Sequence, residues 1–179
     1  MRAGGSKQKG GAFERKICVA LSLWVSNGKK KDLYWRAAMS GGRATIGKKR
    51  GEHLSRQAGD ICAVSPEGHS LTDKYYLECK HHKNLRLDSF IFGTGLLTKF
   101  WKETCIQATR YGKEPMLIAK SNNMPIVVLT YFNPGLSIIT QSIATVGECS
   151  IRLFDDVISH RYKPPLIIER IDALERVRL

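Results

Sequence analysis

The chain has 179 residues, of which 42% are hydrophobic, and its net charge is +13. This size and composition suit one globular domain with a hydrophobic core. No apolar run reaches the length of a membrane span, and the N-terminus lacks the apolar stretch of a signal peptide. We therefore expect a cytoplasmic protein without a membrane partner. The five cysteines are odd in number and scattered, so we also expect reduced thiols.

The positive charge is concentrated in the first third of the chain. Residues 1–58 contain fourteen Lys or Arg against three acids, a net charge of +11, whereas residues 59–179 have a net charge of only +2. Such an asymmetry favours a polyanionic partner, because contacts to phosphates release counterions and give affinity that does not depend on sequence. A basic surface that serves only solubility is the alternative.

The predicted elements alternate between helices and strands. Residues 1–11 are rich in Gly and Lys and are expected to form a flexible basic tail. Apolar side chains then recur at helical spacing before Asn27-Gly28, which predicts a helix over 12–26. The next expected elements are a strand at 33–38, a basic loop at 40–58, strands at 60–65 and around Glu78, and one long or two shorter helices over 88–111. Strands at 116–119 and 125–131 follow. The extension at 132–179 is expected to contain short strands at 136–140, 151–154 and 166–168 and a helix at 155–160. This order predicts an α/β domain with a mixed sheet flanked by helices.

Three charged residues stand out in the middle of the chain, namely Asp60, Glu78 and Lys80. Glu78 and Lys80 are two positions apart in a β-prone run, so they should project from the same face of a strand. If residues 60–65 pair with that strand as an antiparallel hairpin around a turn at 66–68, Asp60 lies opposite Glu78 or Lys80. A charge cluster on apolar strands is costly unless it is compensated, and a divalent cation is the simplest compensator.

These residue types suit the metal-dependent hydrolysis of phosphodiesters. Mg²⁺ and Mn²⁺ prefer oxygen ligands, which the carboxylates of Asp60 and Glu78 and the backbone carbonyl of Cys79 can supply. A metal-bound water ionises more readily, and the metal polarises the phosphoryl oxygen. Lys80 would orient the attacking water and offset the developing negative charge. Glu14, in the first turn of the first predicted helix, could add a carboxylate to a second metal or through a water; its alternative role is to complement the helix dipole.

The pattern Asp60 … Glu78-Cys79-Lys80, with a helical Glu14 before it and a helix carrying Gln107 after it, resembles the PD-(D/E)XK nuclease superfamily. Residues 10–15 (Gly-Gly-Ala-Phe-Glu-Arg) resemble the first helix of archaeal-type Holliday-junction resolvases, as found also in phages. Met39-Ser40-Gly41-Gly42 resembles the Gly/Ser loop of those enzymes, and residues 107–111 (Gln-Ala-Thr-Arg-Tyr) are similar to the Gln-x-x-x-Tyr element of the RecB-like branch. Gly59 stands where the motif has its proline.

The resemblance implies a single-domain restriction-endonuclease-like core, expected over residues 12–131, that cleaves DNA with Mg²⁺ and often forms a homodimer. It implies catalytic roles for Lys80, Glu14, Gln107 and Ser40, and metal ligation by Asp60, Glu78, the Cys79 carbonyl and Glu14. We interpret the basic residues Arg43, Lys48, Lys49, Arg50, Lys29 and Lys30 as contacts to DNA phosphates. For Lys29 and Lys30 the alternative is that they only offset the dipole of the first helix.

The leading hypothesis is therefore a metal-dependent endonuclease selective for DNA structure, similar to a Holliday-junction resolvase, which acts as a homodimer on branched or duplex DNA. Two alternatives stay open. One is a restriction-type or DNA-processing nuclease on the same core. The other is a nucleic-acid-binding protein without catalysis, in which the acids are structural. Charge alone does not distinguish DNA from RNA as the partner.

Overall fold

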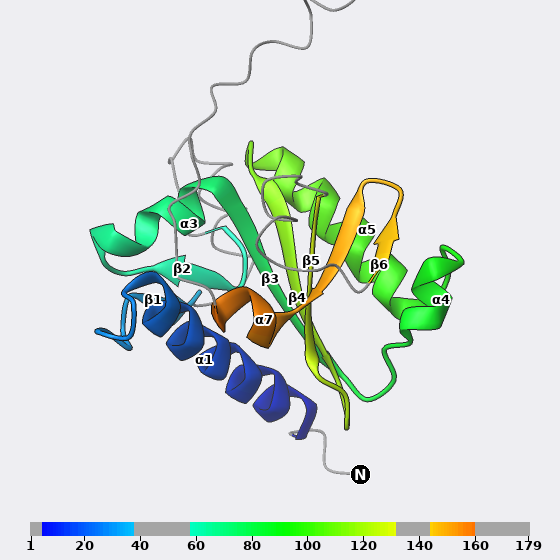
Figure 1. Ribbon diagram of the computed structural model, residues 1–179, viewed down its shortest axis with the longest axis horizontal. Helices are drawn as coiled ribbons and strands as arrows, with labels where there is room; N and C mark the ends of the chain where they lie inside the picture. The colour runs from blue at the N-terminus through cyan, green and yellow to red at the C-terminus, as the bar shows by residue number, and fades with distance from the viewer. Residues whose placement is uncertain (1–4, 38–57, 132–143, 160–179) are drawn as a thin grey trace, which may run out of the picture.

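The computed structural model describes residues 5–37, 58–131 and 144–159. The elements are, in chain order, α1 (Gly5–Val25), β1 (Tyr34–Arg36), β2 (Ile61–Ala63), η2 (Pro66–Gly68), α3 (His69–Lys74), β3 (Tyr75–His82), α4 (Leu87–Ile91), α5 (Gly95–Arg110), β4 (Glu114–Ser121), β5 (Ile126–Tyr131), β6 (Ala144–Val146), β7 (Cys149–Leu153) and α7 (Phe154–Ser159). Figure 1 shows a twisted sheet with α1 and α7 on one side and α4 and α5 on the other.

Within the described ranges, the main sheet has five strands in the order β3-β4-β5-β7-β6. β3 and β4 run parallel, and the other neighbouring pairs are antiparallel. β1 and β2 form a separate antiparallel pair, which reaches β3 through a parallel bridge between Gly59 and Leu77. This mixed sheet between helices confirms the predicted α/β restriction-endonuclease-like fold. It also makes β3 an edge strand of the main sheet.

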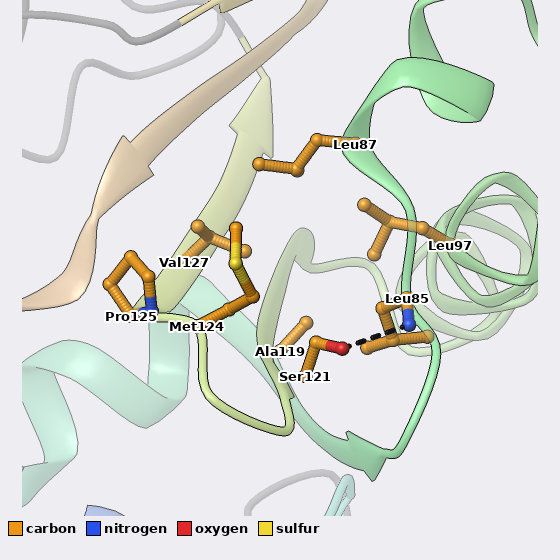
Figure 2. Close-up of a pocket in the computed structure, with 8 residues that line it drawn as sticks. All are labelled: Leu85, Leu87, Leu97, Ala119, Ser121, Met124, Pro125 and Val127. Carbon is orange, nitrogen blue, oxygen red and sulfur yellow. Dashed lines mark hydrogen bonds between the residues drawn. The ribbon is translucent and has the colours of Figure 1, made fainter.

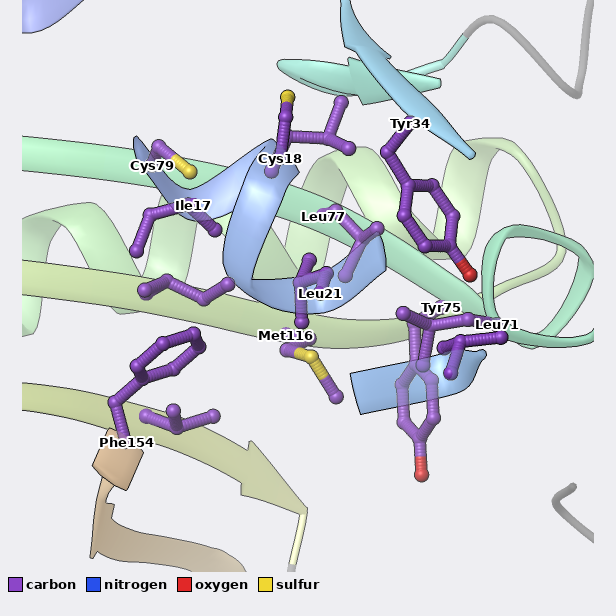
Figure 3. Close-up of a cluster of buried hydrophobic side chains, with 14 of the residues drawn as sticks. Ile17, Cys18, Leu21, Tyr34, Leu71, Tyr75, Leu77, Cys79, Met116 and Phe154 are labelled. Carbon is purple, nitrogen blue, oxygen red and sulfur yellow. The ribbon is translucent and has the colours of Figure 1, made fainter. Parts of the chain in front are cut away.

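An apolar cluster fills each side of the sheet. On the first side, Ile17 and Leu21 of α1 pack against Leu77 and Cys79 of β3 (Figure 3). On the second side, Leu97 of α5 belongs to a cluster with residues of β4, β5 and β7. Burying each such aliphatic side chain stabilises the fold by roughly 1.5–3 kcal/mol relative to exposure. Because strand side chains alternate, the odd-numbered residues 75, 77 and 79 of β3 face α1, and the even-numbered residues 76, 78 and 80 face α5.

The predicted hairpin between residues 60–65 and the Glu78 strand is wrong. β2 pairs with β1 instead, and the segment predicted as a turn forms η2, after which α3 precedes β3. A helical connection allows two neighbouring strands to run in the same direction, which a tight turn cannot do. The backbone of Asp60 nevertheless meets β3, because its amide donates a hydrogen bond to the Leu77 carbonyl (2.8 Å). The expected proximity of Asp60 to Glu78 thus arises from a different pairing.

The first helix begins at Gly5, earlier than the predicted start at Ala12, so residues 5–11 are not part of a flexible tail. Tertiary contacts hold these turns in place. The Lys9 ammonium donates to Asn122 Oδ1 (2.8 Å), and the Arg36 guanidinium lies over Gly11, where an added Cβ would be 3.1–3.2 Å away from it. These tertiary contacts stabilise the first turns of α1 in spite of the low helix propensity of the glycines.

The region predicted as one long or two shorter helices contains two, α4 and α5. They are separated at Gly93 and Gly95, whose φ angles of +70° and +82° are incompatible with a continuous helix. β6 was not predicted, and the predicted strands at 136–140 and 166–168 lie outside the described residues, as does most of the 40–58 segment. None of the helices in residues 5–37, 58–131 and 144–159 has the length and apolar character to cross a bilayer.

A small apolar hollow lies where the segment after β3 meets the β4–β5 turn (Figure 2). At its edge the Ser121 hydroxyl accepts a hydrogen bond from the Leu85 amide (3.1 Å) and donates one to the Lys83 carbonyl (3.1 Å). These bonds fix the end of β3 to the end of β4. The residues that line the hollow are Leu85, Leu87, Leu97, Ala119, Ser121, Met124, Pro125 and Val127.

Candidate active site at the edge of the sheet

Asp60 is a buried carboxylate that is clamped against β3. It is 5% exposed. Its Oδ2 accepts a hydrogen bond from the Cys79 amide (2.9 Å), while its own amide donates to Leu77 (2.8 Å). On the other side, the Asp60 carbonyl accepts a hydrogen bond from the amide of Ala37 (2.9 Å). The carboxylate is therefore held between the β1–β2 pair and the edge of the main sheet.

Gly59 brings the Asp60 backbone close enough for this clamp. Its φ is +95°, and a Cβ added there would lie 2.5 Å from the Leu77 carbonyl oxygen. Proline has a fixed φ near −65° and cannot adopt this conformation. The glycine at the position of the motif's proline is thus explained by the backbone, since only glycine combines a positive φ with such a close approach.

Glu78 and Lys80 share the α5 face of β3, as predicted from their spacing, and form an ion pair there. The side chains are 16% and 31% exposed, respectively. The Tyr76 hydroxyl, two positions earlier on the same face, donates a hydrogen bond to the Glu78 carboxylate. Sequence analysis missed Tyr76, although its spacing of two from Glu78 is the same signal that linked Glu78 with Lys80.

The charges in this cluster act on one another. Burial, and then the negative charge of Asp60, raise the pKa of Glu78 to about 7. Burial alone would lower the pKa of Lys80, but the charge and hydrogen bond of Glu78, followed by the charge of Asp60, raise it above its usual value. Two carboxylates thus share one ammonium group, so an additional positive charge at the site would be stabilised.

Helix α5 lies over this face of β3. Lys80 Nζ is 5.6 Å from the ring centroid of Phe100, and Tyr111 stacks on Tyr76 with ring centroids 5.9 Å apart and an interplanar angle of 12°. Phe100, Thr104, Gln107 and Tyr111 recur at spacings of four, three and four, so they share one stripe of the helix. Half-buried Gln107 therefore lies on this stripe between Phe100 and Tyr111, the residues that make the two contacts.

The donor set fits a hard divalent cation. The Cys79 amide points to Asp60, and since the N–H and C=O groups of a strand residue point to the same side, its carbonyl also faces that edge. The Cys79 thiol lies in the cluster on the α1 side, where burial raises its pKa, so it is not a thiolate ligand. Among the residues that the structure describes, no three His, Cys, Asp or Glu side chains converge. A cation held by Asp60, Glu78 and the Cys79 carbonyl would retain several waters, as Mg²⁺ does.

The other predicted site residues are placed less directly. Glu14 lies on α1, where its carboxylate accepts a hydrogen bond from Arg36 Nε (2.5 Å). The Lys30 ammonium pairs with Glu67, and Lys29 is exposed. Surface pairs of this kind contribute little and exchange readily. Ser40, Arg43, Lys48, Lys49 and Arg50 lie outside the described residues. Arg36, the partner of Glu14, was missed because nothing in the sequence relates β1 to α1.

Fold and site together define a restriction-endonuclease-like domain with an Asp … Glu-x-Lys pattern, in which Asp60 is held against the edge strand β3 that carries Glu78 and Lys80. The family model described as "Phage putative PDDEXK endonuclease" matches residues 5–172. The chain belongs to this family, and thereby to the PD-(D/E)XK superfamily, whose nucleases generally use divalent metals. No curated protein and no solved structure matches the chain.

The raised pKa of Glu78 predicts a pH-dependent affinity for metal. Below about pH 7 the carboxyl binds a proton that a cation must displace. We expect the affinity for Mn²⁺ to fall as the pH is lowered from 7, by up to about tenfold per unit, with about one proton released on binding. Calorimetry in two buffers of different ionisation enthalpy measures both quantities. Glu78→Gln should remove the dependence, and an affinity that stays constant between pH 7 and 5.5 would contradict the prediction.

Proposed function

We propose that this protein is a Mg²⁺- or Mn²⁺-dependent endonuclease that hydrolyses phosphodiester bonds in DNA. One observation carries the proposal: buried Asp60 is clamped beside the Glu78–Lys80 pair at the edge of the main sheet. Membership of a PD-(D/E)XK endonuclease family supports the nuclease activity, and the net charge of +13 supports a nucleic acid as substrate.

Each residue of the cluster has a distinct task in this proposal. Asp60, Glu78 and the Cys79 carbonyl would hold the cation, which when bound lowers the pKa of a coordinated water and polarises a phosphoryl oxygen. Lys80 has three N–H donors, one of which Glu78 uses. The other two can orient the attacking water and stabilise the negative charge that develops on the phosphate. Tyr76 holds the Glu78 carboxylate in position, and Gln107 would offer an amide from the facing stripe of α5.

We further propose that the enzyme prefers branched DNA and works as a homodimer. The similarity of residues 10–15 and 39–42 to Holliday-junction resolvases supports this, and two sites in a dimer would allow two strands to be nicked. The catalytic contributions of Glu14 and Ser40, and phosphate contacts by Lys29, Lys30, Arg43, Lys48, Lys49 and Arg50, belong to the same proposal. The alternative is a restriction-type or processing nuclease on this core.

The decisive experiment compares a four-way junction, a linear duplex and a single strand of matched sequence in Mg²⁺. We expect cleavage of the junction in preference to the other two, and paired nicks near its centre. Equal cleavage of all three would overturn the selectivity for branched DNA but leave the nuclease activity, whereas products at one fixed sequence would favour the restriction-type alternative. Sedimentation of the protein with a junction tests the dimer.

Lys80→Met separates an enzyme from a binding protein without catalysis. We expect this variant to lose at least about a hundredfold in single-turnover rate, because a positioned donor to the transition state is removed. Its affinity for DNA, measured in EDTA, should stay within about threefold of wild type, since phosphate contacts are distributed over many cations. Retention of the wild-type cleavage rate would contradict the assignment of Lys80. Lys99→Met, at an exposed position of α5, is the matched control.

A further inference from the structure

A second group of basic side chains lies on the opposite face of β3 from Lys80. His81 follows Lys80 directly, and in the parallel register of β3 and β4 it is the partner of Lys120. His81 is an odd-numbered residue of β3, so its side chain points to the α1 side. Lys120 is an even-numbered residue of β4 and points to the same side, as Met116 and Ile118 do. The ring of His81 contacts the ring of Phe13 on α1, with centroids 5.4 Å apart. The strand register thus places an imidazole beside an ammonium group.

Lys9 adds a third basic side chain, from α1. Its ammonium donates a hydrogen bond to Asn122 Oδ1 (2.8 Å), which anchors it over the β4–β5 turn just beyond Lys120. The positive charges of Lys9 and Lys120 both act on the His81 ring. Three side chains from α1, β3 and β4 therefore share one small region.

The acids of the neighbourhood do not neutralise this group. Glu78 and Asp60 lie with Lys80 on the α5 side and the outer edge of β3, and Glu14, which follows Lys9 on α1, is engaged by Arg36. His81 Nε2 is shielded from solvent and has no hydrogen-bond partner within the described part of the chain. Gathering like charges and burying a polar atom without a partner are both unfavourable, so the arrangement favours an anion that supplies charge and acceptors together.

We propose that Lys9, His81 and Lys120 form a binding site for a backbone phosphate of the DNA substrate. This proposal rests on the proposed function and extends it, because it assigns a position to a second phosphate of the substrate. The edge strand β3 presents Lys80 to one side and His81 to the other, so the DNA backbone crosses this edge with the scissile phosphate at Lys80 and another phosphate at Lys9, His81 and Lys120. The bonds of Ser121 that join the ends of β3 and β4 keep this site rigid.

The test is a fluorescence-anisotropy titration of labelled duplex with the full chain in EDTA, at several salt concentrations. We expect Lys9→Gln/Lys120→Gln to weaken binding by about tenfold and to reduce the slope of log affinity against log salt by about 1, as for one lost phosphate contact. His81→Gln alone should weaken binding less. Thermal unfolding of each variant shows whether the fold is kept.

The control is Lys74→Gln/Arg110→Gln, which removes two positive charges far along β3 from His81. Lys74 directly precedes β3, and Arg110 precedes Tyr111, which stacks on Tyr76 near the same end of the strand. Equal losses in the two double variants would overturn the proposal, since the effect would then be one of total charge. Cleavage in Mg²⁺ is measured separately: wild type that binds DNA with the expected salt slope but never cleaves overturns the proposed function and leaves this site standing. If wild type cleaves DNA but Lys9→Gln/Lys120→Gln binds DNA like wild type, this phosphate site is overturned and the proposed function stands.

Discussion

Asp60→Asn is expected to reduce Mg²⁺-dependent cleavage by at least about a thousandfold, because a bound metal ion contributes several kcal/mol of charge stabilisation to such a reaction. The substitution keeps the shape of the side chain and an oxygen that can accept the hydrogen bond from the Cys79 amide. It removes one of the two carboxylates that would hold the cation. The loss should therefore appear in metal affinity and in cleavage, while the affinity for DNA in EDTA stays near that of wild type.

The same variant has an effect that needs neither metal nor substrate. The charge of Asp60 helps to raise the pKa of Glu78 to about 7, so removing that charge should lower the pKa of Glu78 toward its ordinary value. Carboxyl chemical shifts followed by NMR against pH report this change. Asp155→Asn, an exposed substitution on α7, should alter neither the pKa of Glu78 nor cleavage. An Asp60→Asn protein that binds Mn²⁺ and cleaves like wild type would remove Asp60 from the site.

That Glu78 and Lys80 lie together could be predicted from the sequence because strand periodicity is a strong local signal. Alternation by two places Glu78 and Lys80 on one face whatever the strand pairs with, and the structure confirms this shared face, on which the two side chains form an ion pair. The same alternation also places Tyr76 on this face. It was not predicted as a site residue because a tyrosine in a strand is usually an apolar packing residue. Fold class followed from the alternation of helical and extended segments.

The pairing of the strands could not be predicted in the same way. The short helix α3 spans six residues, too few for a helical period to be recognised, so the segment was interpreted as part of a hairpin. Asp60 nevertheless reaches Glu78 because the Gly59–Leu77 bridge brings the chain to β3 in the parallel direction. The ion pair of Glu14 with Arg36 depends on how α1 packs on β1, which is a tertiary contact with no local signature.

Gly59→Pro, the substitution that would restore the sequence of the motif, is expected to prevent stable folding. Proline requires a φ near −65°, whereas Gly59 has a φ of +95°. Its ring would also occupy the space in which a Cβ lies 2.5 Å from the Leu77 carbonyl oxygen. We expect a loss in the free energy of unfolding of about 3 kcal/mol or more, since backbone strain and steric overlap add. Urea denaturation followed by circular dichroism measures it.

Gly59→Ala and Gly112→Ala separate the two causes. Gly112 also has a positive φ, of +65°, but a Cβ added there meets nothing within 4 Å. The alanine at 112 therefore incurs only the cost of the left-handed backbone, about 1 kcal/mol, whereas the alanine at 59 also displaces the Leu77 carbonyl from the bridge. Because that bridge holds Asp60, the Gly59→Ala protein should bind Mn²⁺ weakly even where it remains folded. If the two alanine variants are equally stable and both bind metal like wild type, then the close approach at Gly59 does not position the site.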